Sequence, residues 1–263
     1  MNNYIIIIIL IIILSFLFYF IDRLGIRRYK VMDHFSNNEI PKIIIQTWKD
    51  NMIPDKYKAE IDTIKKLNPT YEYYFFTDDD IEAFLKENYE DYYKTYQKLP
   101  IKIQKIDFFR YVAVYHYGGI YLDLDMTGLL PFDDILKYNV VFPIDQNITE
   151  NRCRKERFKP FCEKDMKFLL GQYAFASKPK HPFIKLLVDN IHNNIDKYIE
   201  DYKINGKELI YTYSTTGPDF VSNVYYDYPN KDEIHILHDD RSQFFGNYAK
   251  HNFMGSWKDG KKG

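Results

Sequence analysis

Residues 106–126 read IDFFRYVAVYHYGGIYLDLDM, and their pattern predicts the central elements of the fold. We expect a helix from about Ile101 to His116, followed by Gly118-Gly119 and a strand from Ile120 to Asp125. The paired glycines permit a sharp turn that larger side chains would hinder. The stretch therefore predicts a helix that turns directly into a strand ending in acidic residues.

The end of this strand carries two carboxylates in alternating positions. Successive side chains of a strand point to opposite faces, so one face takes Ile120, Leu122 and Leu124 and the other takes Tyr121, Asp123 and Asp125. Two carboxylates on one face place several hard oxygens around a common point, which suits Mg²⁺ or Mn²⁺. Such a metal can bind a diphosphate and neutralise its charge as it leaves. The alternative is an ordinary solvated strand end.

Asp107 and Arg110 lie three residues apart in the preceding helix and therefore on the same side of it. The Gly-Gly turn would return that side towards the paired carboxylates. Arg110 would then reach a phosphate or ribose, and Asp107 would accept hydrogen bonds from sugar hydroxyls. The alternative is an ordinary surface ion pair, which contributes little to stability.

Strands and helices alternate on both sides of this stretch. The sequence predicts strands at 43–45, 71–76, 140–144, 173–177 and 234–237, and helices at 55–67 and from Pro182 onward. Asp78, Asp79 and Asp80 stand where a helix N-terminus favours capping and negative charge. This alternation predicts an α/β fold with a largely parallel sheet, in which ligands bind at the carboxyl ends of the strands.

Composition excludes several classes of protein. The chain has 263 residues and a net charge of −1, so no basic field indicates a nucleic-acid partner. Cys153 and Cys162 are too few for a disulfide scaffold, and one bridge or two reduced thiols are both compatible with them. Asn147-Ile148-Thr149 is the one usable glycosylation sequon, which favours a lumenal domain only weakly.

The N-terminus differs from the rest of the chain. From Tyr4 to Ile21 every residue except Ser15 is apolar or aromatic, and these eighteen residues would reach roughly 27 Å as a helix. We expect a transmembrane signal anchor at 1–21, a stem at 22–40 and one catalytic domain at 41–263; a cleaved signal peptide is the alternative. The basic residues that follow the span favour a cytoplasmic domain.

At this point the sequence resembles glycosyltransferase family 32, which includes fungal Golgi mannosyltransferases and bacterial capsule glycosyltransferases. Residues 106–126 resemble its Asp-X-Asp sugar-nucleotide region. Four further blocks stand in the family's order: IPKIIIQTWKD at 40–50, YAFASKPKHPF at 173–183, TTGPDF at 215–220 and HNFMGSW at 251–257. A more distant similarity is to the glucosylating domains of large clostridial toxins.

The resemblance implies a Rossmann-like GT-A fold and metal-dependent transfer of a hexose, with retention of configuration, from a UDP- or GDP-sugar to a glycan or glycoconjugate acceptor. It implies Mn²⁺ or Mg²⁺ at Asp123, Asp125 and His251. The residues that it implies for the donor are Thr47, Trp48, Asp107, Arg110, Tyr121, Asp123, Ser256 and Trp257. For Trp48 the alternative is simple burial, and for His251 a solvated tail residue. The resemblance also favours a lumenal domain, whereas the basic residues after the span favour a cytoplasmic one.

Two positions complicate this resemblance. The family usually has His where this chain has Ile45, and we expect that change to affect packing or base contacts, with consequences for nucleotide preference. Asp219 is a catalytic candidate that would face the acceptor or the reacting carbon, and the alternative, which we favour slightly, is that it caps the following helix. Variable loops such as 145–170 would build the acceptor pocket.

Two other functions compete with glycosyl transfer. Asp123-Leu124-Asp125-Met126-Thr127 matches the nucleophile motif of haloacid-dehalogenase-type phosphohydrolases, and Asp239-Asp240 resembles their late acidic motif. That nucleophile, however, normally ends the first strand of its domain, whereas some 80 patterned residues precede it here. The third possibility is a non-catalytic, membrane-anchored sugar-binding protein.

Overall fold

The structure is a computed structural model, and it describes residues 39–205, 208–238 and 243–254. The expected anchor and most of the expected stem lie outside these residues. Within the described part of the chain, no helix is both long enough and apolar enough to span a bilayer.

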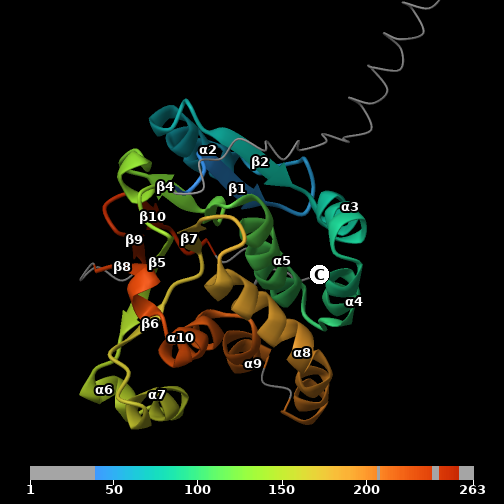
Figure 1. Cartoon of the computed structure of the whole chain (residues 1–263), viewed down its shortest axis with the longest axis vertical. Coiled ribbons are helices and arrows are strands. Elements are labelled where there is room, and N and C mark those ends of the chain that lie inside the picture. Colours follow the sequence, from blue (N-terminus) through green and yellow to red (C-terminus); the bar gives the residue numbers. More distant parts are fainter. Residues whose placement is uncertain (1–38, 206–207, 239–242, 255–263) are drawn as a thin grey trace, which may run out of the picture. The chain divides into compact units, whose positions relative to one another are not determined.

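A seven-stranded sheet forms the centre of the domain (Figure 1). Its main path runs β2-β1-β3-β7-β5-β6, and β8 pairs with β5 off this path. The strands are β1 (Ile43–Thr47), β2 (Glu72–Phe76), β3 (Gly119–Leu122), β5 (Val140–Asn147), β6 (Phe168–Leu170), β7 (Ala174–Ser177) and β8 (Ile234–Leu237). A second sheet has the order β4-β10-β9, from β4 (Met126–Gly128), β9 (Phe244–Phe245) and β10 (Ala249–His251).

The α/β class is confirmed, and the expectation of a largely parallel sheet is confirmed in part, because β6 and β7 run opposite to the other five strands. β1 runs parallel to β2 and β3, and β5 runs parallel to β8, whereas β7 is antiparallel to both of its neighbours and β6 is antiparallel to β5. The alternation of elements along the chain does not encode strand direction: β6 runs opposite to β5 although helical segments at Glu150–Cys153 and Lys159–Glu163 separate the two strands along the chain. β3 and β5 nevertheless run in the same direction, since both are antiparallel to β7.

Most predicted elements are confirmed within a few residues. The helices are α2 (Asp55–Leu67), α3 (Asp78–Asn88), α4 (Glu90–Lys98), α5 (Lys102–Tyr117), α6 (Glu150–Cys153), α7 (Lys159–Glu163), α8 (Pro182–Asn205), α9 (Glu208–Thr215) and α10 (Pro218–Asp227). Short 3₁₀ turns occupy Asp133–Ile135, Glu156–Phe158 and Lys231–Glu233. At α3 the capping residue is Thr77, whose hydroxyl accepts from the Asp80 amide while the Asp80 carboxylate accepts from the Thr77 amide.

The turn between α5 and β3 requires its two glycines. Both have positive φ, +68° at Gly118 and +86° at Gly119. A Cβ atom on Gly119 would lie 2.6 Å from the carbonyl oxygen of Ile43 in β1. The close approach of β3 to β1, and hence the position of everything that follows β3, depends on this absence of a side chain.

The two faces of β3 pack against different residues. Ile120 and Leu122 belong to a core cluster shared with Ile64 of α2 and with residues of the small sheet. Tyr121 points to the other face, where its ring lies 5.8 Å from that of Phe175. On the helical side α4, α5 and α8 pack against one another (Figure 1). The alternation predicted for the first residues of this strand is therefore confirmed.

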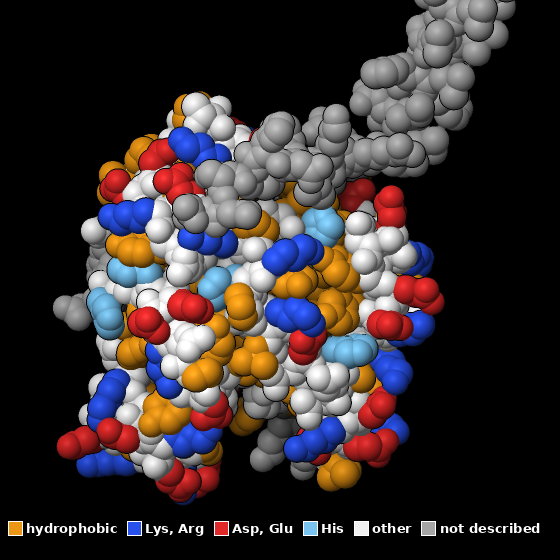
Figure 2. Space-filling view, viewed as in Figure 1, with side chains coloured by type: hydrophobic (Ala, Val, Ile, Leu, Met, Phe, Trp, Pro, Cys, Tyr) orange, Lys and Arg blue, Asp and Glu red, His pale blue; other side chains and the backbone are white. Residues whose placement is uncertain are grey.

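Charge is evenly mixed over the face shown in Figure 2. Acidic and basic side chains are interspersed there, and neither sign forms a continuous field. This distribution agrees with the net charge of −1. Polar residues of the sheet lie at the carboxyl ends of β1, β3 and β5, and a ligand site is therefore expected at this edge.

Candidate active site

The site begins where β3 ends. The strand stops at Leu122, so the prediction of a strand up to Asp125 is wrong. Asp123 still donates its amide to the Tyr173 carbonyl at 2.8 Å, Leu124 and Asp125 form a turn, and Met126 starts the second sheet. The two carboxylates are therefore gathered by a turn and not by strand alternation.

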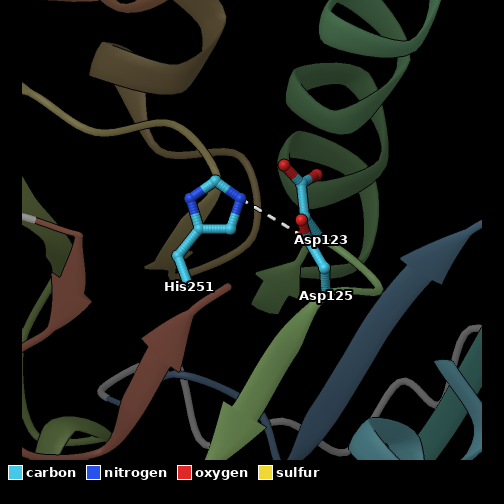
Figure 3. Close-up of side chains that lie close together, drawn as sticks. All are labelled: Asp123, Asp125 and His251. Atoms are coloured by element: carbon cyan, nitrogen blue, oxygen red, sulfur yellow. Dashed lines mark ion pairs between the residues drawn. The ribbon is translucent and has the colours of Figure 1, made fainter. Parts of the chain in front are cut away.

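His251 is brought to these carboxylates by the second sheet. In the antiparallel pairing of β10 with β4, His251 lies opposite Met126, the residue after Asp125. Its Nε2 atom is 3.2 Å from Oδ1 of Asp125, and its ring stacks on Tyr173 with 4.6 Å between centroids. Figure 3 shows the imidazole pointing towards both carboxylates.

One ligand atom each from Asp123, Asp125 and His251 lies within 4.8 Å of the other two. Two carboxylates and an imidazole are a donor set that suits Mn²⁺, and the carboxylates suit Mg²⁺. The residues present thus fit a divalent cation, and they converge although the third is more than 120 positions from the first two.

Asp125 is held by the segment that follows His251. The Met254 amide donates to Oδ2 of Asp125 at 2.9 Å, and the Asn252 amide donates to its backbone carbonyl at 2.9 Å. Burial by itself would raise the pKa of Asp125, but the hydrogen bond and charge of His251 and the Met254 amide outweigh it and hold that pKa below its ordinary value. Burial raises the pKa of Asp123, opposed mainly by Arg110.

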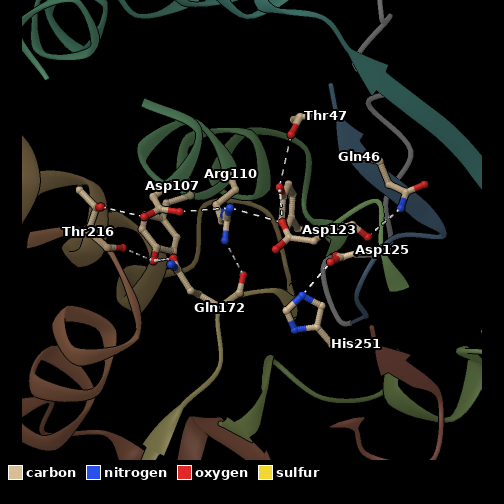
Figure 4. A network of polar contacts seen from close by, with 11 residues as sticks. Gln46, Thr47, Asp107, Arg110, Asp123, Asp125, Gln172, Thr216 and His251 are labelled. Atoms are coloured by element: carbon tan, nitrogen blue, oxygen red, sulfur yellow. Dashed lines mark hydrogen bonds and ion pairs between the residues drawn. The ribbon is translucent and has the colours of Figure 1, made fainter. Parts of the chain in front are cut away.

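Arg110 and Asp107 form a buried network behind the cluster (Figure 4). Nη2 of Arg110 lies 3.1 Å from Asp107 and 3.3 Å from Asp123, and Nη1 donates to the Gln172 carbonyl at 3.0 Å. The Thr216 hydroxyl donates to Asp107 at 2.8 Å. Arg110 is 3% exposed and Asp107 1%, so the alternative of a surface ion pair is wrong. Burial raises the pKa of Asp107 to about 6, against the opposing effect of Arg110.

The geometry of Arg110 shows how it acts on the site. Its guanidinium is engaged by protein groups, and its contact with the cluster is through Asp123. Nε of Arg110 and Oδ1 of Asp107 are buried without a hydrogen-bond partner among the described residues. The arrangement orients Asp123; direct binding of a donor by Asp107 or Arg110 stays a prediction.

A second set of contacts reaches Asp123 from β1 and the facing side of β3. The Tyr121 hydroxyl donates to Oδ1 of Asp123 at 2.9 Å and lies 3.4 Å from the Thr47 hydroxyl. Gln46 donates its side-chain amide to the Asp123 carbonyl at 3.2 Å and accepts from the Tyr73 hydroxyl at 2.6 Å. Thr47 and Tyr121, predicted as donor-binding residues, therefore lie beside the cluster.

Trp48 follows β1 directly and packs on Tyr57 of α2, with 4.9 Å between ring centroids. The indole Nε1 and the Tyr57 hydroxyl are both buried, and neither has a hydrogen-bond partner in the part of the chain described. Trp48 is only half-buried. Stacking of Trp48 on a nucleotide base stays a prediction. Ile45 is fully buried in β1, where it contributes to packing.

Asp219 does not cap its helix. The N-cap residue of α10 is Gly217, and Asp219 in the first turn binds Arg157 through two contacts, Nε to Oδ2 at 2.9 Å and Nη2 to Oδ1 at 2.5 Å. The capping interpretation is therefore wrong, because the charged partner outcompetes the helix's own amides for the carboxylate. Its catalytic role stays a prediction.

Arg157 lies in an excursion closed by a disulfide bond. Cys153 and Cys162 are joined, which decides between the two alternatives left open by the sequence. The bridge encloses the 3₁₀ turn that carries Arg157, and the Arg157 guanidinium also lies 4.3 Å from the centroid of the Tyr213 ring.

Several predicted residues lie outside the described ranges. These are Ser256 and Trp257 of the last sequence block, together with Asp239 and Asp240 of the phosphohydrolase alternative. Among the described residues, the sequence reasoning missed four that hold the site: Gln46, Arg157, Gln172 and Thr216. Gln46 and Thr216 stand inside blocks that already carried the family resemblance, whereas nothing distinguished Arg157 within its charged segment.

Several curated proteins are similar in sequence to this chain. Inositol phosphoceramide mannosyltransferase 1 of Schizosaccharomyces pombe is 28% identical over 188 residues, covering 70% of this chain and 50% of the relative. Mannosyl phosphorylinositol ceramide synthase CSH1 of Saccharomyces cerevisiae is 30% identical over 190 residues, covering 72% and 43%. The chain thus spans half or less of the length of these relatives.

Solved structures support the fold. A ligand-free glycosyltransferase domain from the YGT toxin matches with a TM-score of 0.52 at 10% identity, over 76% of this chain and 80% of that one. The glycosyltransferase PaToxG matches with a TM-score of 0.51 at 16% identity, over 74% and 73%. At these identities the likeness shows the shared α/β glycosyltransferase fold.

A family comparison covers the part of the chain that contains two of the three candidate metal ligands. Residues 54–142 match the family described as the glycosyltransferase sugar-binding region containing the DXD motif. This range includes α5, the glycine turn, and both Asp123 and Asp125. Over these residues the chain is therefore similar to the DXD-containing glycosyltransferases that its sequence blocks resemble.

Proposed function

We propose that this protein transfers a hexose from a nucleotide diphosphate sugar to a glycan or glycoconjugate acceptor, with retention of configuration and with a divalent cation. The observation that carries the proposal is the convergence of Asp123, Asp125 and His251 at the carboxyl end of β3. Ligands of α/β folds bind at this edge of the sheet. The family of residues 54–142 supports sugar binding at the same place.

The protein's own residues prepare this site before any ligand arrives. Arg110 and Tyr121 fix the Asp123 carboxylate, and the Met254 amide fixes Asp125. These contacts remove the cost of ordering the carboxylates at the moment of binding, which is how preorganised groups favour catalysis. A bound Mn²⁺ or Mg²⁺ would supply charge neutralisation for the departing nucleoside diphosphate. Thr47 and Trp48 would then meet the nucleoside from the β1 side.

The curated relatives suggest which substrates to try first. Their names specify mannosyl transfer and a phosphoinositol ceramide acceptor. We therefore propose mannose as the first donor sugar to test and a glycolipid as one acceptor class. Membrane attachment through residues 4–21 would place the domain beside such an acceptor, and it stays part of the proposal.

The test is release of nucleoside diphosphate from a panel of GDP-mannose, UDP-glucose, UDP-galactose and UDP-N-acetylglucosamine, with and without Mn²⁺. We expect slow, Mn²⁺-dependent hydrolysis of one of these sugars. Asp125→Asn should reduce it by about 100-fold or more, because it removes a ligand of the cation that would stabilise the charge developing on the departing diphosphate, and loss of such electrostatic stabilisation typically has that effect. Asp62→Asn is the matched control, since Asp62 is an exposed carboxylate on α2. Absence of nucleotide-sugar binding and turnover with every metal and donor would refute the proposal.

A further inference from the structure

Asp145 is a carboxylate at the site edge that the sequence did not single out. It lies in β5, where the pairing with β6 is irregular: Ile144 pairs with Leu170, but Gln146 pairs with Leu169. Asp145 is thus the extra residue of a β-bulge. Bulges of this kind bend a strand and redirect the side chain of the extra residue, and they are frequent next to active sites.

The register of the sheet places Asp145 beside the metal-ligand candidates. Ser177 of β7 pairs with both Gly119 of β3 and Val140 of β5. Asp123 is four residues beyond Gly119, and Asp145 is five residues beyond Val140 in a strand of the same direction. Both carboxylates therefore emerge at the same level of the same edge, separated by the one strand β7.

The side of the cluster on which Asp145 lies is the informative point. β1, with Thr47 and Trp48, adjoins β3 on one side, and β7 and β5 follow on the other. A nucleoside bound over β1 and a diphosphate at the end of β3 leave the β7–β5 side for the hexose and the acceptor. Asp145 stands at that end of the edge.

The surroundings of Asp145 leave its carboxylate available to a ligand. Charged neighbours that act on it are Arg157, Asp219 and His251, and the Gln146 side chain donates a hydrogen bond to it. Arg157 is committed to Asp219 by two contacts, and within the described residues no ion pair is formed by Asp145 itself. Asp145 as a whole residue is half-buried, so it is not sealed within the core.

We infer that Asp145 binds sugar hydroxyls, either those of the transferred hexose or those of the acceptor, as a carboxylate acceptor of hydrogen bonds on the non-nucleotide side of the metal centre. This inference rests on the proposed function and deepens it. A carboxylate is suited to the role because it accepts hydrogen bonds only and offers about four lone-pair directions to a polyol.

The experiment measures binding and transfer separately for wild type, Asp145→Ala, Asp145→Asn and the control Asp62→Asn. GDP and UDP with Mn²⁺ probe the nucleotide side by calorimetry, the corresponding nucleotide sugars add the hexose, and methyl α-mannoside serves as a simple acceptor. We expect Asp145→Ala to bind the nucleoside diphosphate like wild type. Loss of the carboxylate should either weaken the binding of the nucleotide sugar by about 10-fold or raise the KM for the glycoside by about 10-fold, since hydrogen bonds to charged groups are of that strength.

The two arms identify the source of the hydroxyls. Weaker binding of the nucleotide sugar with an unchanged KM for the glycoside assigns Asp145 to the donor hexose. The reverse result assigns it to the acceptor. Asp145→Asn, which keeps one acceptor oxygen, should fall between wild type and Asp145→Ala. The inference is overturned if Asp145→Ala matches Asp62→Asn in every constant, or if it loses nucleoside diphosphate binding as well. Failure of wild type to bind any nucleotide sugar would instead overturn the proposed function.

Discussion

Two arginine–aspartate pairs flank the candidate metal centre, and they are built differently. Arg110 divides its Nη2 atom between Asp107 at 3.1 Å and Asp123 at 3.3 Å, and both Arg110 and Asp107 are almost completely buried. Arg157 gives two contacts to the single carboxylate of Asp219, at 2.9 and 2.5 Å, and its side chain is 19% exposed.

The contacts indicate that the two pairs have different roles, since Arg110 is shared between two carboxylates whereas Arg157 and Asp219 hold one another. Arg110 interacts with two carboxylates, and its Nε atom has no hydrogen-bond partner among the described residues. Its positive charge therefore stabilises both carboxylates and positions that of Asp123. Arg157 and Asp219 satisfy one another through the parallel, bidentate geometry that makes such pairs strong. The partial exposure of Arg157 also lets water compensate its charge when Asp219 is changed, whereas Asp219 itself is only 3% exposed.

Arg110→Ala tests the more buried pair and should have the largest effect on stability. The change leaves Asp107 and Asp123 buried without their shared positive charge, and removal of one partner from a buried pair costs about 3–5 kcal/mol. Urea unfolding followed by circular dichroism measures the loss.

Lys102→Ala is the control for this variant. Lys102 pairs with Asp78 at 2.5 Å, but its side chain is 64% exposed. Loss of an exposed pair should cost less than about 1 kcal/mol. Equal effects of Arg110→Ala and Lys102→Ala would contradict the role assigned to the buried network.

Asp219→Asn tests the anchored pair and should cost less than Arg110→Ala. The amide keeps the shape and one acceptor oxygen but loses the charge, and Arg157 can regain water. We expect a loss of about 1.5–3 kcal/mol, the range for hydrogen bonds to charged groups. A double-mutant cycle with Arg157→Gln isolates the interaction itself, because the two residues contact each other directly. A coupling energy near zero would show that the pair is not an anchor.

The sequence predicted the parts of the fold that local chemistry determines. Gly118 and Gly119 mark the α5–β3 turn because only residues without a Cβ tolerate their backbone and the contact with Ile43. The strands around them follow from short β-branched and apolar runs. Strand direction was not predictable in the same way, since β7 has the same local pattern whether it runs parallel or antiparallel.

The candidate site also combines residues that local sequence predicts with residues that only non-local pairing brings together. Asp123 and Asp125 are two residues apart and were found from spacing, although the turn after Leu122 brings them together by a different geometry. His251 reaches them only through the β4–β10 pairing, which no local pattern encodes, and the family resemblance alone named it. Arg157 had no signal, because a lone charged residue in a charged segment reads as surface, and Asp145 follows the predicted strand at 140–144 with no second acidic residue to mark it.

The smallest expected effect concerns pH and connects the anchored pair with Asp145. Burial raises the pKa of Asp145 from 3.8 to about 6, against the opposing effect of Arg157. The folded carboxyl thus keeps its proton over a range in which the unfolded chain has released it, so its contribution to stability is present below about pH 4 and is lost as pH rises through 6.

The stability difference between wild type and Asp145→Asn should therefore change between pH 4 and 6, with wild type losing about 1 kcal/mol relative to the variant after solvent screening. Other groups, including Asp107, titrate in both proteins and cancel in this difference. Asp219→Asn as the common background should flatten the change, because it removes a nearby negative charge and releases Arg157 to act on Asp145. A change of the same size in that background would mean that Arg157 is already free to compensate Asp145, and that the distinction between a divided and a committed arginine does not hold.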